Sequence, residues 1–248
     1  MDNKKQIFVL VHGSWHGGWC WEKVEKSLLE RGHQVVSPTL LGMTSKNDPN
    51  AKKAGLLKHV DQIVEMISPN NFDSVILVGH SYAGMVITGV ANKIPENISK
   101  LVYLDAFLPD HNQSLFDISL PERVKVMIDS LVDSSGKTLV DGAEEVWLLP
   151  VRDPATFGVT QVDDVLYLKE KMVPTPILTF QEKVLADNPK ALSIPKYYIR
   201  CLDCPLMERF ENKAKNLGYC VYSIKSGHDA MITNPGELSD LLVEIGNH

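Results

Sequence analysis

One serine stands between an apolar strand and a helix, and this junction constrains the fold more than any other feature. Residues 75–78 form a continuous apolar run that leads into Gly79, and a helical spacing of apolar residues begins soon after Ser81. At such a turn the serine backbone is strained, so the residues two before and two after it must be small. Here they are Gly79 and Ala83. The pattern predicts a nucleophilic hydroxyl beside a helix N-terminus, and its alternative is a serine that only caps the helix.

Short apolar runs alternate with helical periodicity along much of the chain. This rhythm predicts βαβ units and a parallel sheet within a single α/β domain, the default for 248 residues. The runs carry no polar face, as expected for strands covered on both sides. The six expected strands are 7–11, 34–38, 74–78, 101–104, 197–201 and 220–224.

The rhythm breaks between residues 107 and 196, which are rich in proline and contain no buried-strand run. Helical pieces are expected at 122–131 and 162–171. An insertion of this length predicts a helical cap over a core made of residues 1–106 and 197–248. Apolar cap residues favour an apolar substrate group, although they could also pack the cap on the core; they are Leu115, Phe116, Met127, Leu131, Trp147 and Phe157.

A histidine and two aspartates follow expected strands and complete a candidate catalytic set. His228 comes after the last strand, which would place its imidazole over the carboxyl edge of the sheet. Asp203 follows strand 197–201, and Asp105 ends the strand after the serine. We expect Asp203 to be the acid, with Asp105 as the alternative. In either case the carboxylate would orient the imidazole and stabilise its protonated form.

A glycine-rich bend follows the first strand, where a first oxyanion donor would be expected. The bend begins His12-Gly-Ser14, and the backbone N–H groups of Ser14 and Tyr82 would together hold an oxyanion. His12 and His16 resemble bases or metal ligands, but we expect both to hold the loop by hydrogen bonds.

Charge and cysteine content exclude several classes of function. The 25 Lys and Arg against 31 Asp and Glu give a net charge of −6 without a basic cluster, which argues against nucleic acid or a membrane as partner. Because residues 7–11 are too short for a signal peptide core and no run could span a bilayer, a cytoplasmic protein is expected. Cys201 and Cys204 have CxxC spacing, but no second pair supports zinc, so we expect free thiols, no metal and no cofactor.

Four segments resemble a family, the esterase and hydroxynitrile-lyase group of the α/β-hydrolases, which includes plant methylesterases and bacterial carboxylesterases, some of them pyrethroid hydrolases. The segments are VHGSWHGGWCW (11–21), GHSYAG (79–84), LDAFLP (104–109) and GHD (227–229). The resemblance implies the α/β-hydrolase fold, a triad of Ser81, Asp203 and His228, and oxyanion amides at Ser14 and Tyr82.

Two departures from the family pattern bear on function. The family usually has two residues between the strand 197–201 and the acid, whereas only Leu202 precedes Asp203 here. Lyase members carry a lysine after the catalytic histidine, to hold cyanide, and this chain has Asp229.

The expected activity is hydrolysis of a small to medium, partly apolar carboxylic ester through an acyl-enzyme. The alternatives are a C–C hydrolase or hydroxynitrile-lyase-like enzyme, and a ligand receptor of the hydrolase fold with little turnover. The expected partner is the small-molecule substrate, with a homodimer left open.

Overall fold

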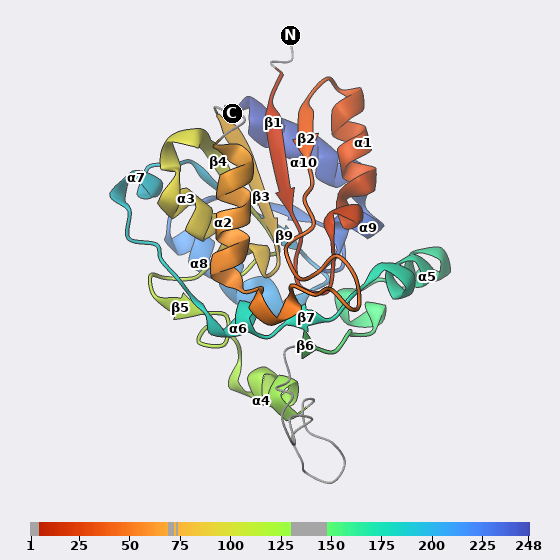
Figure 1. Cartoon of the computed structure of the whole chain (residues 1–248). Helices are drawn as coiled ribbons and strands as arrows, with labels where there is room; N and C mark the ends of the chain where they lie inside the picture. The colour runs from red at the N-terminus through yellow and green to blue at the C-terminus, as the bar shows by residue number, and fades with distance from the viewer. Residues whose placement is uncertain (1–4, 69–71, 73, 130–147) are drawn as a thin grey trace.

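The structure is a computed structural model that describes residues 5–68, 72, 74–129 and 148–248. Six parallel strands form its central sheet in the order β10-β9-β4-β3-β1-β2 (Figure 1). Their bounds are β1 (Ile7–Val11), β2 (Gln34–Val36), β3 (Val75–His80), β4 (Ile98–Leu104), β9 (Lys196–Cys201) and β10 (Cys220–Ile224). All six expected strands are confirmed, with ends that shift by up to three residues.

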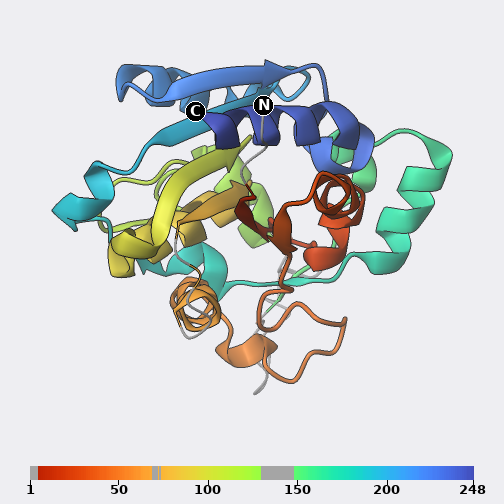
Figure 2. The same ribbon diagram turned by 90° about the horizontal axis from the view of Figure 1, so that it is seen from above.

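Helices cover both faces of the sheet. α1 (Glu22–Glu30) packs on α10 (Pro235–Asn247), and α2 (Leu56–Ile67) packs on α3 (Ala83–Lys93). Figure 2 shows these two pairs on opposite faces of the strands. The apolar stripe of α2 is buried, as its spacing predicts. α8 (Glu208–Asn216) packs on β9 and β10, and the short α9 (Ala230–Thr233) precedes α10.

The segments between β4 and β9 cross the carboxyl ends of the strands (Figure 1). Their helices are α4 (Pro121–Asp129), α5 (Val162–Lys171), α6 (Leu178–Gln181) and α7 (Pro189–Leu192). Two antiparallel pairs accompany them: β5 (Gln113–Ser114) with β8 (Lys183–Val184), and β6 (Leu148–Leu149) with β7 (Thr175–Pro176). Short 3-10 turns lie at Gly18–Trp21, Ala51–Lys53, Pro95–Asn97, Pro154–Phe157 and Pro205–Met207.

The expected helix at 162–171 is confirmed, and the one at 122–131 is found one residue earlier, although its last two residues lie outside the described residues. Because β8 contacts both α2 and α3, part of the segment between β4 and β9 lies against the helices of the core. The division into a core and a separate cap therefore stays a prediction. Among the described residues, no helix is both long and apolar enough to cross a membrane.

Gly84 lets the chain after β4 pass close to α3. A Cβ atom at Gly84 would lie 2.0 Å from the carbonyl oxygen of Phe107. The crossing is held by two backbone hydrogen bonds, from Ser81 N to Leu104 O at 3.2 Å and from Phe107 N to Ser81 O at 3.1 Å. The serine turn and Asp105 are therefore fixed relative to one another by a contact that only glycine permits.

Gly84→Ala should lower the free energy of unfolding by about 1–3 kcal/mol, because the added methyl overlaps the Phe107 carbonyl. Gly236→Ala is the matched control, since a Cβ there meets no atom within 4 Å. Urea unfolding followed by circular dichroism gives both values. Equal stabilities for the two variants would contradict the close approach.

Candidate active site

Ser81 occupies the strained turn that its neighbours predict. Its φ is +56°, in the left-handed region, between the end of β3 and the start of α3. A Cβ at Gly79 would lie 2.7 Å from Ala83 O, and one at Gly13 would lie 2.9 Å from Ser81 Cβ. Small residues on both sides therefore allow the turn, and Ser81 lines the cavity described below.

His228 lies between the serine and a buried carboxylate. Its Nε2 is 2.9 Å from Ser81 Oγ, and its Nδ1 is 2.7 Å from Asp105 Oδ2. With Nδ1–H donating to the carboxylate, Nε2 is free to accept the serine hydroxyl. The imidazole is held from behind by His80, whose Nε2 lies 3.0 Å from the carbonyl oxygen of His228. The expected juxtaposition of Ser81 and His228 is present.

Asp105 is fully buried and accepts hydrogen bonds from three directions. Beside the bond to His228, its Oδ1 lies 3.1 Å from Arg200 Nη1 and 3.1 Å from the backbone nitrogen of Cys201. Its φ of +40° turns the side chain out of the strand path at the end of β4. A buried carboxylate of this kind needs a cationic partner, and Arg200, which is 3% exposed, provides it.

The expectation that Asp203 contacts His228 is corrected by this geometry. Pairing of β9 with the chain after β10 continues past Cys201, through hydrogen bonds from Leu202 N to Ile224 O and from Asp203 N to Ser226 O, both 3.0 Å. The Asp203 carboxylate is 45% exposed and bonded to Lys225. The acid at Nδ1 is the alternative, Asp105.

Cys204 stands near the position where the family pattern would put the acid. Its Sγ is 3.8 Å from His228 Nδ1. Burial favours the neutral imidazole, but the hydrogen bonds to Asp105 and Cys204 outweigh it and raise the pKa of His228 above its usual value. Asp105, Cys204 and His228 bring three potential metal ligands within 4.8 Å of one another. Nδ1 and the Asp105 carboxylate are already bonded to each other, and the absence of a metal stays a prediction.

The two expected oxyanion donors flank Ser81. Ser14 follows β1 and lines the same cavity, and Tyr82 directly precedes α3. The loop carrying Ser14 is held by His12, whose Nε2 accepts from Leu40 N at 3.0 Å, and by a 2.6 Å bond from Trp15 N to Thr175 Oγ1. His12 therefore has the structural contacts that we expected.

Asp229, which stands where the lyases have lysine, is buried and paired with His16. Its Oδ2 is 3.0 Å from His16 Nε2, and both side chains are at most 1% exposed. Burial opposes both charges, but the pairing raises the pKa of His16 and lowers that of Asp229. Asp229 therefore offers a carboxylate in place of the cation that a cyanide would need. Sequence reasoning found neither this pair nor the Arg200 contact.

Asp229→Asn should destabilise the protein by about 3–5 kcal/mol, because it breaks a buried ion pair. The raised His16 pKa adds stability that is complete below 6.5 and lost as pH rises through the folded pKa; the lowered Asp229 pKa adds stability that is complete above 3.8. The difference from wild type should therefore be larger at pH 5 than at pH 8.5 in urea unfolding. A difference that grows with pH would refute the pairing.

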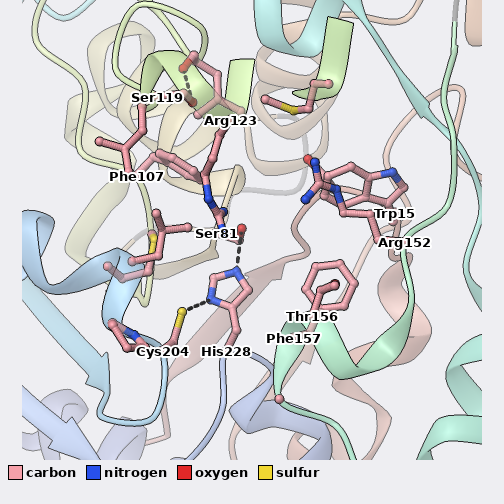
Figure 3. A pocket seen from close by; sticks show the side chains of 18 of the residues that line it. Trp15, Ser81, Phe107, Ser119, Arg123, Arg152, Thr156, Phe157, Cys204 and His228 are labelled. Atoms are coloured by element: carbon pink, nitrogen blue, oxygen red, sulfur yellow. Dashed lines mark hydrogen bonds between the residues drawn. The ribbon is translucent and has the colours of Figure 1, made fainter. Parts of the chain in front are cut away.

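A cavity of about 540 Å³ opens above the Ser81–His228 pair. Figure 3 shows Trp15 and Phe157 on one side of it and Phe107 on the other. Its wall is mainly apolar, but it also contains Arg123, Arg152 and Arg209. Of the expected apolar cap residues, Leu115, Met127 and Phe157 line it, whereas Leu131 and Trp147 lie outside the described residues.

A strained serine after the third strand of a parallel sheet, bonded to a histidine that is itself bonded to a buried aspartate, is the arrangement typical of α/β-hydrolases. A family model described as the alpha/beta hydrolase family matches residues 8–241. The chain therefore belongs to the alpha/beta hydrolase family.

Known proteins narrow the class. The carbendazim hydrolyzing esterase of Nocardioides sp. (strain SG-4G) is 33% identical over 245 residues, which cover 96% of this chain and 99% of that protein. Methylesterase 1 of Arabidopsis thaliana is 37% identical over 118 residues, or 46% of this chain and 44% of that one. An extracellular alpha/beta-hydrolase from a Paenibacillus species superposes with a TM-score of 0.80 at 25% identity, covering 96% and 98% of the two chains. The relatives are hydrolases of the esterase type.

Proposed function

We propose that the chain is a serine carboxylester hydrolase that acts on a small to medium, partly apolar ester through an acyl-enzyme. This proposal rests on the hydrogen bonds that join Ser81 to His228 and His228 to Asp105, with Ser81 facing the cavity. The curated esterase and methylesterase relatives support the reaction type. Asp229 stands where the lyases have the lysine that holds cyanide, so a reaction that releases cyanide is not favoured.

In the proposed mechanism Ser81 Oγ attacks the ester carbonyl carbon while its proton passes to His228 Nε2, 2.9 Å away. The carbonyl oxygen becomes an oxyanion held by the N–H groups of Ser14 and Tyr82. The imidazolium, stabilised by Asp105, then protonates the departing alkoxide, and the acyl group stays on Ser81. Water, deprotonated by the same histidine, releases the acid and restores the serine.

The relatives named for carbendazim hydrolysis and as methylesterases suggest that carbendazim and methyl esters are suitable probes. A volume of about 540 Å³ would take a substrate of drug size, and the apolar wall would receive its less polar part. We propose a cytoplasmic location, a compartment in which the four free thiols of this chain would stay reduced.

Ser81→Ala should lower turnover by a factor on the order of 10³ or more, because it removes the nucleophile. A p-nitrophenyl ester series from acetate to octanoate, with wild type and variant in parallel, measures this effect and the preferred chain length. If both proteins are equally active, or both inert, the proposal fails. In the inert case, a large ligand-induced rise in Tm would point to a receptor with little turnover.

Asp105→Asn should lower kcat by roughly 10⁴-fold, whereas Asp203→Asn should stay within a few-fold of wild type, because only Asp105 holds the imidazole tautomer. Since the base must be neutral and its pKa is raised, the ascending limb of kcat/KM should lie above pH 6.5 in wild type. In Asp105→Asn the limb should move to lower pH. The opposite ranking of the two variants would restore Asp203 as the acid.

A further inference from the structure

The charge of the cavity is opposite to that of the chain. The whole chain carries a net charge of −6, yet three arginines line the cavity: Arg123, Arg152 and Arg209. Asp203 is the one carboxylate among the described lining residues, and it is bonded to Lys225. An arginine side chain stays protonated in proteins, so the described lining residues carry an excess of positive charge.

These arginines come from three separate elements and reach into the same space. Arg123 lies in the first turn of α4, Arg152 follows β6, and Arg209 lies at the start of α8. In Figure 3 the side chain of Arg123 extends toward Ser81 from one side, while Arg152 lies beside Trp15 on the other. The Arg152 guanidinium is 5.0 Å from the centroid of the Trp15 ring, within the range of a cation–π interaction.

The described residues offer these guanidinium groups few hydrogen-bond or ion-pair partners. Within the described ranges, no carboxylate lies within ion-pair distance of Arg123 or Arg152. Arg209 Nη2 donates to the Ile118 carbonyl, and its Nε is buried without a described partner. Burial, and then the charge of Arg123, lower the pKa of both Arg152 and Arg209. The electrostatic repulsion between these like charges falls when an anion binds between them.

We infer that the preferred esters carry a carboxylate, which Arg123 and Arg152 bind while Ser81 attacks the ester carbonyl. A carboxylate matches the two-pronged geometry of a guanidinium, and the apolar wall would hold the carbon chain between the two groups. The inference rests on the proposed function of the site and adds the substrate class. Arg209 lies in the same wall and would add to the attraction.

Two pairs of esters test the inference because the position of the carboxylate, on the acyl or the alcohol side, is left to the experiment. The acyl pair is p-nitrophenyl hemiadipate and its neutral methyl ester, p-nitrophenyl methyl adipate. The alcohol pair is p-acetoxybenzoate and methyl p-acetoxybenzoate. In at least one pair, wild type should show a kcat/KM for the anion about 10-fold or more above that for the neutral ester, as expected for charge-assisted hydrogen bonds.

Arg123→Gln and Arg152→Gln should each lower kcat/KM for the anion more than kcat/KM for the neutral ester, and so remove most of this preference. Arg123→Lys and Arg152→Lys keep the positive charge but lose the planar guanidinium group, and should retain part of the preference for the anionic ester. Arg31→Gln is the control for net charge, because Arg31 pairs with Asp240 outside the cavity.

Three results would overturn the inference. Equal rates on both members of each pair, or a preference for the neutral esters, would show that the arginines do not select anions. A preference that survives in both glutamine variants would place the anion elsewhere. These results leave the proposed esterase function standing, provided wild type hydrolyses the neutral esters and Ser81→Ala does not. If wild type is inert on all four esters, the proposed function fails together with the inference.

Discussion

The buried carboxylate of Asp105 is the contact on which the site depends. It directly follows β4, accepts hydrogen bonds from Arg200 and from the Cys201 amide in β9, and accepts another from His228 in the loop after β10. A carboxylate removed from water costs several kcal/mol unless such donors replace its hydration. The ends of three neighbouring strands can therefore close around it in one arrangement, and this arrangement aims His228 at Ser81.

A second buried carboxylate keeps that loop from turning. Asp229, the residue after His228, is bonded to His16 in the bend after β1, while His80 Nε2 lies 3.0 Å from the His228 carbonyl oxygen. His228 is thus held by three contacts: its ring bonds to Asp105, its backbone carbonyl lies against His80, and the next residue, Asp229, bonds to His16. A base held in this way needs little rearrangement when charge develops on it, which is the condition for electrostatic stabilisation of a transition state.

The strands and the Ser81 turn could be predicted because their causes are local: continuous burial on both faces, and a turn that only small neighbours allow. The acid could not, because Asp105 and Asp203 both follow strand ends at the same edge of the sheet. Two features of the structure distinguish Asp105 from Asp203: the backbone pairing that continues after β9, and the buried positive charge of Arg200 within β9. Arg200 interrupts the apolar run of β9. It directly follows Ile199, which pairs with Leu104 of β4 on the neighbouring strand. A buried arginine needs a carboxylate partner, and Arg200 has two, Asp105 at the end of the adjoining strand and Glu211 of α8.

The segments between β4 and β9 were the least predictable part, and they carry the chemistry that would distinguish one ester from another. Sequence patterns report burial and periodicity, and these segments have little of either, so only the insertion, two of its helices and its apolar content could be inferred. The positions of Arg123 and Arg152 depend on how α4 and the chain after β6 cross the sheet edge. In the proposed esterase, the reacting groups would therefore follow from the fold that the family shares, and the choice of substrate from residues whose partners lie far away in sequence.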